Sequence, residues 1–220
     1  MPSRTANRLM WAAVLLLIAG LALQTRDNLD LYFMGVGKLE VRVAPEVETV
    51  FLFWRGKIEA PMESRVAEAF ERHKGAARKY ILSLSSPGGS LDHGARVVRL
   101  LRKIGETHGI ETVVEARRHC ASMCVPVYLQ GQRRTAAENA KFMFHEVSFR
   151  ESFSSDELDV PEAAKGTATD QLFAKYFAPA GVSTDWIRKV RSDMTGGNDI
   201  WKTGRELIDE NAGIVQDVTN

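Results

Sequence analysis

The sequence predicts a layered α/β domain built from parallel strand–helix–strand units, and two observations lead to this fold class. Apolar stretches typical of buried strands alternate along the chain with stretches whose apolar residues recur every three or four positions, as they do in helices. This alternation is the pattern of consecutive strand–helix–strand units. The length of 220 residues fits one such domain, and an apolar share of 45% supplies the side chains for a buried core.

The individual elements follow from local patterns. Residues 24–44 are expected to be a tether that ends in a short strand, and the main domain is expected at residues 45–220. The stretch TVFLFWRG at 49–56 is almost entirely apolar and ends at a glycine, which is typical of a buried strand. Residues 91–105 carry apolar side chains at helical spacing. On the same grounds we expect strands at 39–43, 49–56, 79–86, 111–116, 140–147 and 213–218, and helices from Pro61, at 91–105, 122–131, 160–178, 183–193 and 203–211.

A targeting segment precedes the domain. Arg4 and Arg8 come before an uncharged, apolar stretch at residues 9–23. This stretch is shorter than the roughly 20 residues of a usual spanning helix and has the length of a signal-peptide core. We therefore expect residues 1–23 to be a signal peptide or, if uncleaved, a membrane anchor. The arginines on its near side predict that the rest of the chain is extracytoplasmic, in the periplasm or exported.

The composition argues against several classes of ligand. Lysine and arginine together number 29 and aspartate and glutamate 28, so no excess of positive charge favours nucleic acid. Two cysteines are too few for a disulfide-rich scaffold, and their spacing is not that of a common zinc motif. We expect neither a metal nor a cofactor.

A glycine-rich turn follows the strand predicted at 79–86. Its sequence is SSPGGS, residues 85–90, and a helix is predicted to begin directly after it. The proline fixes one φ angle, and the two glycines reach φ values that other residues avoid. Such a turn can present backbone N–H groups to an oxyanion. The lysine of a phosphate-binding loop is missing, so a phosphate site is not indicated.

A second turn, HCASMC at residues 119–124, follows the strand predicted at 111–116. It places Ser122 at the carboxyl end of a strand and at the start of an apolar helix, which is where sites gather in parallel α/β folds. A serine nucleophile needs a base within hydrogen-bonding reach. His145, at the end of the strand FMFHEV, returns to the same edge of the sheet and is the candidate. The alternatives are a helix N-cap or a closely packed small residue for Ser122, and a structural role for His145.

Together the motifs resemble the proteolytic subunit of the Clp protease family. The resemblance rests on SLSSPGGSLDHG, CASMC and FMFHE in this order and spacing, and it covers roughly residues 50–218 with its specific part at 83–146. It implies the ClpP/crotonase-like fold, a spiral of βαβ units. It also implies a serine peptidase that cleaves peptides or proteins through an acyl-enzyme.

The resemblance assigns roles to individual residues. Ser122 is implied as the nucleophile and His145 as the general base. The oxyanion hole is implied to consist of the backbone N–H groups of Gly88, Gly89 and Met123.

The family's third catalytic residue is an aspartate that precedes the last helix and strand. Asp199 stands before the helix predicted at 203–211 and is the candidate in this chain, with Asp193 as the alternative. A buried carboxylate at this place would orient the imidazole and stabilise its charged form.

Two features set the chain apart from the family. The soluble peptidase has no apolar segment like residues 9–23, and the chain does not show the loops through which the family docks an ATP-driven unfoldase. These differences predict a membrane or extracytoplasmic peptidase that works without ATP, with a degenerate, inactive copy as the alternative. The family also implies a homo-oligomer, a ring or trimer, for which the polar segment 150–166 is a candidate arm.

Cys120 and Cys124 bracket Ser122 and are a disulfide candidate. On a helix, residues four apart lie about 6 Å from each other by rise alone, within the Cα–Cα range of disulfides. An extracytoplasmic location permits the bond, which would fix the turn that holds Ser122 and Met123. Two reduced, buried cysteines are the alternative.

Other functions are kept as alternatives. Lys165 would be the base of a Ser-Lys dyad, as in membrane-bound proteases of the wider class, if burial lowered its pKa. A non-catalytic scaffold or binding module is the second alternative, because fold does not prove function. Acyl-CoA chemistry on the crotonase version of the fold is disfavoured by the serine–histidine pair.

Overall fold

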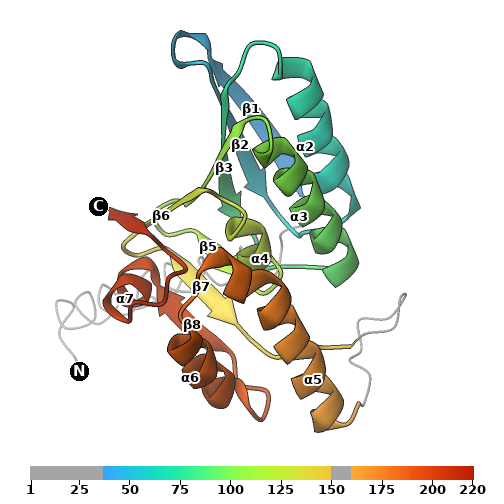
Figure 1. Cartoon of the computed structure of the whole chain (residues 1–220), viewed down its shortest axis with the longest axis vertical. Helices are drawn as coiled ribbons and strands as arrows, with labels where there is room; N and C mark the ends of the chain where they lie inside the picture. Colours follow the sequence, from blue (N-terminus) through green and yellow to red (C-terminus); the bar gives the residue numbers. More distant parts are fainter. Residues whose placement is uncertain (1–36, 150–159) are drawn as a thin grey trace, which may run out of the picture. The chain divides into compact units, whose positions relative to one another are not determined.

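The computed structural model describes residues 37–149 and 160–220 (Figure 1). The expected targeting segment at 9–23 lies outside these residues, as does most of the expected polar arm at 150–166. Among the described residues, no helix is long and apolar enough to span a membrane. The signal peptide or anchor and the extracytoplasmic location therefore stay predictions.

Among the described residues, the larger of two sheets has six strands in the order β1-β2-β3-β4-β6-β9 (Figure 1). β1 runs antiparallel to β2, and the remaining neighbours are parallel. Its strands are β1 Lys38–Ala44, β2 Thr49–Arg55, β3 Lys79–Ser85, β4 Gly109–Val114, β6 Arg133–Ala137 and β9 Asp217–Thr219.

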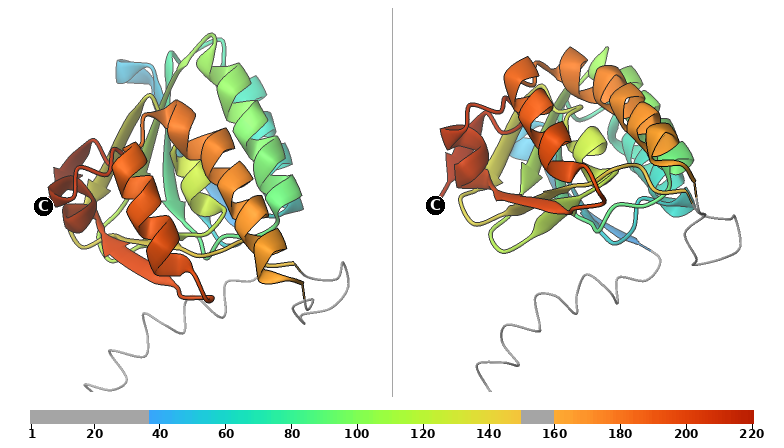
Figure 2. Two further views of the ribbon diagram at one scale, coloured as in Figure 1. Left: turned by 60° about the horizontal axis from the view of Figure 1, so that its bottom comes forward. Right: turned by 90° about the horizontal axis from the view of Figure 1, so that it is seen from below.

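Two amphipathic helices, α2 (Ala60–His73) and α3 (Leu91–Gly105), lie side by side against this sheet (Figure 2, left). Side chains alternate along β2, so that Leu52 and Trp54 are buried and the residue between them is partly exposed. The alternation arises because successive residues of a strand point to opposite faces of the sheet. Leu101 of α3 belongs to the same core.

A second, three-stranded sheet has the order β5-β7-β8. β5 (His119–Ala121) is parallel to β7 (Lys141–Phe144), and β7 is antiparallel to β8 (Ile200–Thr203). A β-bridge between Ser86 and Cys120 joins β5 to the turn that follows β3. The two turns that the sequence singles out are therefore neighbours in space.

The C-terminal helices pack beside this second sheet (Figure 2). Trp186 lies against Phe144 of β7, with ring centroids 5.1 Å apart. The C-terminal helices are α5 Glu162–Leu172, which continues into a π-helical turn Phe173–Phe177 and a 3-10 turn Ala178–Ala180, α6 Thr184–Met194 and α7 Gly204–Asp209.

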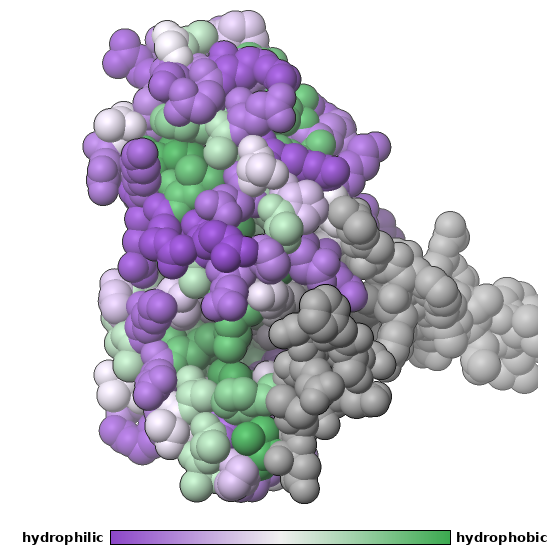
Figure 3. All heavy atoms as spheres, turned by 90° about the vertical axis from the view of Figure 1, so that its right-hand side faces the viewer, coloured by the Kyte–Doolittle hydropathy of each residue, from purple (hydrophilic) through white to green (hydrophobic). Residues whose placement is uncertain are grey.

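The face that carries α2, α3 and α5 has two areas of apolar surface separated by a polar band (Figure 3).

The predicted order of elements is confirmed, and α3 has the predicted bounds. The prediction of a parallel sheet is only partly right, because β1 and β8 each pair antiparallel with a neighbour. The short strands β5, β6 and β8 were not predicted. The helix predicted at 122–131 is confined to α4, Cys124–Tyr128, and the strand predicted at 213–218 begins only at Asp217.

Candidate active site

Ser122 occupies the turn between β5 and α4, in a conformation that few side chains adopt. Its φ angle is +52°, in the left-handed region. Its backbone N–H donates to the carbonyl of Met143, at 2.9 Å, which fastens the turn to β7. A residue held in this strained region is typical of functional turns, because the surrounding structure must maintain it.

His145 lies within hydrogen-bonding distance of Ser122. Its Nε2 is 2.7 Å from the Ser122 Oγ. The two residues meet because β5 and β7 are parallel neighbours in which Ala121 pairs with Met143. Ser122 directly follows β5 and His145 directly follows β7, so both leave the second sheet at the same edge.

The glycine-rich turn packs directly against Ser122. Gly88 and Gly89 have φ angles of +95° and +155°, so both use the freedom that glycine has. A Cβ added at Gly88 would lie 2.7 Å from the Ser122 Cβ, which is closer than side chains approach. The carbonyl of Gly88 accepts a hydrogen bond from Ile58 at 2.7 Å, which anchors the turn from its other side.

The N–H groups at the two turns differ in whether they already have an acceptor. Gly88 N–H donates to the Ser86 Oγ at 3.1 Å. In the part of the chain that the structure describes, the N–H groups of Gly89 and Met123 donate to no protein acceptor. Two of the three predicted oxyanion donors are therefore available to a ligand.

A small pocket of about 60 Å³ lies beside these residues. Ser122, Met123, His145 and Gly89 all line it. The rest of its lining is largely apolar and includes Leu91, Met143, Val147, Leu172, Phe173 and Phe177.

Comparison with solved structures identifies the fold. A mutant of ClpP1 from Listeria monocytogenes matches with a TM-score of 0.57 and 17% sequence identity, over 80% of this chain and 93% of the ClpP1 chain. The chain has a ClpP-like fold. The fold expected from the three motifs is thereby confirmed, and an identity of 17% carries the comparison no further than the fold. No protein-family model and no curated protein matches the sequence.

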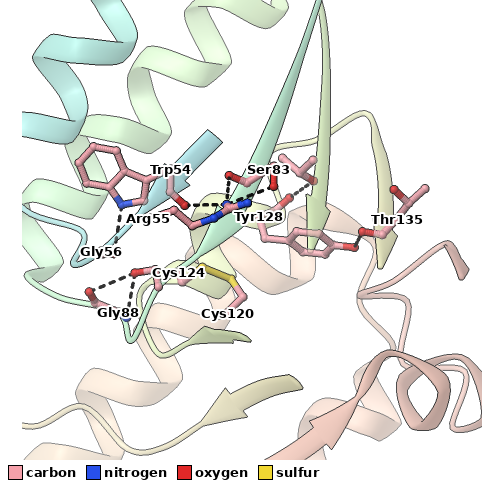
Figure 4. Close-up of a disulfide and its surroundings, with 11 residues drawn as sticks. Trp54, Arg55, Gly56, Ser83, Gly88, Cys120, Cys124, Tyr128 and Thr135 are labelled. Carbon is pink, nitrogen blue, oxygen red and sulfur yellow. Dashed lines mark hydrogen bonds between the residues drawn. A yellow bond between two sulfur atoms is a disulfide. The ribbon is translucent and has the colours of Figure 1, made fainter. Parts of the chain in front are cut away.

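On this ClpP-like fold, a disulfide spans the turn that holds Ser122 (Figure 4). It joins Cys120, the middle residue of β5, to Cys124, the first residue of α4, with the Cα atoms 5.2 Å apart. Both cysteines are fully buried. The disulfide expected from the sequence is confirmed, and the left-handed turn at Ser122 separates the strand that carries Cys120 from the helix that carries Cys124.

The two aspartates proposed for the third catalytic place are both exposed. Within residues 37–149 and 160–220, neither Asp199 nor Asp193 hydrogen bonds to His145. Asp199 nevertheless immediately precedes β8, whose first residue Ile200 pairs with Phe144. The ladder ends at this pair, and one further step of the same antiparallel register would set Asp199 opposite His145.

Lys165, the alternative base, lies in the first half of α5 and is partly buried. Between described residues, no hydrogen bond joins it to Ser122, whose hydroxyl is bonded to His145. The described residues also contain no group of three or more histidine, cysteine, aspartate or glutamate side chains arranged to hold a metal ion.

Proposed function

We propose that this chain is a serine peptidase in which Ser122 is the nucleophile and His145 the general base. The observation that carries the proposal is the 2.7 Å contact between the Ser122 Oγ and the His145 Nε2. A serine hydroxyl is a weak nucleophile at neutral pH unless a base takes its proton as it attacks. The ClpP-like fold supports the choice of peptide or protein as substrate.

The reaction follows from this pair. With the imidazole proton on Nδ1, Nε2 accepts the hydroxyl proton while Oγ attacks the carbonyl carbon of the scissile peptide bond. The imidazolium then gives that proton to the leaving amine, and an acyl-enzyme remains on Ser122. A water molecule, deprotonated by His145, hydrolyses the ester and restores both residues.

The negative charge of the tetrahedral intermediate needs hydrogen-bond donors. We assign this role to the N–H groups of Gly89 and Met123, because neither has a protein acceptor among the described residues. Gly88 N–H is already bonded to Ser86, so Gly88 contributes through its shape, by letting the turn approach Ser122. Donors fixed in advance stabilise a developing charge without reorganising.

Asp199 is the proposed partner of the His145 Nδ1. The support comes from the register of β7 and β8, which would set the two residues opposite each other if it were extended one step beyond the last pair. Side chains directly opposite in antiparallel strands have Cβ atoms about 4.5–5.5 Å apart, so a rotation of the Asp199 side chain can bring its carboxylate to the ring. Asp193 is the alternative, since it lies one residue before the end of α6 and six positions before Asp199.

The proposed place of action is outside the cytoplasm, without an ATP-driven partner. Residues 9–23 support export, and a disulfide between buried cysteines suits an oxidising compartment. The test is a pair of reporters fused after Asn220, one active only outside the cytoplasm and one only inside. Activity of the cytoplasmic reporter alone would contradict the assigned topology.

We further propose a homo-oligomer. Exposed apolar side chains, Val43, Val47 and Trp201, are available on the surface for contact with other copies. Light scattering on the purified full-length protein should give a mass that is a multiple of the 24.5 kDa chain, reduced by the mass of residues 1–23 if these are cleaved. A monomer at micromolar concentration would contradict the proposal.

The test of the function is covalent labelling with a fluorophosphonate, which reacts with activated serines. The full-length protein should be labelled, and mass spectrometry of its peptides should place the adduct on Ser122. Ser122→Ala should not be labelled. Ser148→Ala is the matched control, because Ser148 lines the same pocket, and it should be labelled like the wild type. An adduct on another residue, or no adduct, would contradict the role of Ser122 and favour a non-catalytic scaffold with a ClpP-like fold.

A further inference from the structure

The chain segment that carries His145 has no sheet partners of its own on leaving β7. Residues 145–149 belong to no described helix or strand. The backbone that follows His145 is therefore held in place by contacts outside the sheets. Among the described residues, two polar contacts do so, and both lead to α5.

The first contact is a hydrogen bond from the Val147 N–H to the Thr169 Oγ1, at 2.8 Å. Thr169 lies on α5 and is fully buried. Its hydroxyl also donates to the Lys165 carbonyl one helical turn earlier, at 2.8 Å. One hydroxyl thus connects the backbone of α5 to the backbone of the segment, two residues after His145.

The second contact runs through Arg191 of α6. Its guanidinium pairs with Glu146, the residue after His145, at 3.4 Å. The same group donates to the Gly166 carbonyl at 3.2 Å and pairs with Asp170 at 2.8 Å, both on α5. The side chains of Arg191 and Glu146 are only 16% and 10% exposed, so solvent screens this pair less than a surface pair.

We propose that Thr169 is a positioning residue for His145, with Arg191 as its support. The inference rests on the proposed function, since it concerns how the general base is aimed at Ser122. The Thr169 hydroxyl fixes the position of the backbone at Val147 relative to α5. The position of the imidazole depends on this backbone, because only one residue, Glu146, separates His145 from Val147. Leu172, the last residue of the same helix, and Phe173, which follows it, line the pocket beside Ser122, so the Thr169 hydroxyl also couples the pocket wall to the base.

Thr169→Val tests the proposal most closely. The variant keeps the branched shape and removes the hydroxyl that accepts from Val147. A displacement of reacting groups by about 1 Å can cost on the order of 100-fold in rate. We therefore expect the rate of fluorophosphonate labelling at Ser122 to fall at least about tenfold.

Two further variants separate positioning from a general effect on the helix. Thr167→Val is the matched control, because the Thr167 hydroxyl makes the same type of bond, to the Ala163 carbonyl at 2.8 Å, but Thr167 is exposed and does not contact the segment. It should label like the wild type. Thr169→Ser retains a hydroxyl and should restore most of the rate. An unchanged rate in Thr169→Val, an equal loss in Thr167→Val, or no rescue by serine would each overturn the proposal.

Hydrogen exchange provides a readout that does not depend on catalysis. The Val147 amide of the full-length wild type should be protected, and in Thr169→Val its exchange should accelerate while the core strand β3 stays protected. A Val147 amide that exchanges in the wild type as fast as an unstructured peptide would overturn the inference, even if Thr169→Val failed to fold. Absence of labelling in the wild type would instead reject the proposed function, so the two failures are distinguishable.

Discussion

The Oγ of Ser122 and the Nε2 of His145 lie 2.7 Å apart, although 23 positions separate the two residues in the sequence. The parallel pairing of β5 with β7 brings them together, and the backbone at Ser122 is left-handed. The pair is thus a product of the second sheet and of the turn that packs on it. Changes to either should affect labelling of Ser122 without touching the two side chains.

Gly88→Ala should disable the site. A methyl group at this position would lie 2.7 Å from the Ser122 Cβ and 2.8 Å from the Ala121 carbonyl oxygen, so the turn holding Ser122 must move. The left-handed φ of +95° adds strain for alanine, of about 1–2 kcal/mol. We expect the labelling rate to fall at least about 100-fold.

The control for this change is Gly75→Ala. A Cβ at Gly75 meets nothing within 4 Å, so the free energy of unfolding of this variant should differ from that of the wild type by no more than about 0.5 kcal/mol. Its labelling rate should equal that of the wild type. Normal labelling of Gly88→Ala would show that the close approach of the two turns is not required.

Some of this arrangement could be predicted from the sequence. The bounds of α3 are local in origin: Ser90 caps the helix by accepting from the His93 N–H, and apolar side chains recur at helical spacing behind it. Ser122 and His145 stand out in the sequence because each follows a predicted apolar strand in a distinctive motif. Local signals of this kind do not depend on the rest of the fold.

Other features could not be predicted, because they arise only from tertiary contacts. β5 has three residues, too few for any periodicity, and it exists through its pairing with β7. The proposed pairing of Asp199 with His145 depends on β8, a strand of only four residues. Thr167 and Thr169 look alike in the sequence, and only the packing of α5 gives Thr169 its contact with Val147.

The disulfide should stabilise the turn around Ser122. The mass of protein purified without reductant should be lower than that of the reduced chain by two hydrogens. Replacing both cysteines by alanine should lower the free energy of unfolding by about 2 kcal/mol, the value expected for so short a loop. Labelling should slow as well, because the bond joins the residues on either side of the turn. Unchanged stability and labelling in the double variant would mean that packing alone holds the turn.

Asp199→Asn should slow labelling by about 10- to 100-fold, to a rate between those of the wild type and His145→Ala. The variant keeps the shape of the side chain and removes the charge that would stabilise the imidazolium. Asp193→Asn is the comparison and should have a mild effect. The reverse ranking would assign the third catalytic place to Asp193.

Arg134→Met should be strongly destabilising. The buried guanidinium donates to the carbonyls of Ile214, Gly213 and Ala180, which ties the C-terminal segment to β6, and burial lowers its pKa. Each buried acceptor left without a donor costs about 1–3 kcal/mol, so we expect a loss of at least about 2 kcal/mol in chemical denaturation.

The neighbouring Arg133→Met provides the contrast for Arg134. The Arg133 side chain is 61% exposed and pairs with Asp217 at 3.3 Å, so removing it should lower the free energy of unfolding by at most about 1 kcal/mol. Equal effects of the two substitutions would refute the role given to the buried arginine.

The most direct test of the account is the rate constant for fluorophosphonate labelling of the full-length protein, compared among the wild type, His145→Ala and Lys165→Ala. The account predicts an adduct on Ser122 in the wild type, a fall of at least about 100-fold in His145→Ala, and a rate near that of the wild type in Lys165→Ala. Normal labelling of His145→Ala together with loss of labelling in Lys165→Ala would contradict it and make lysine the base.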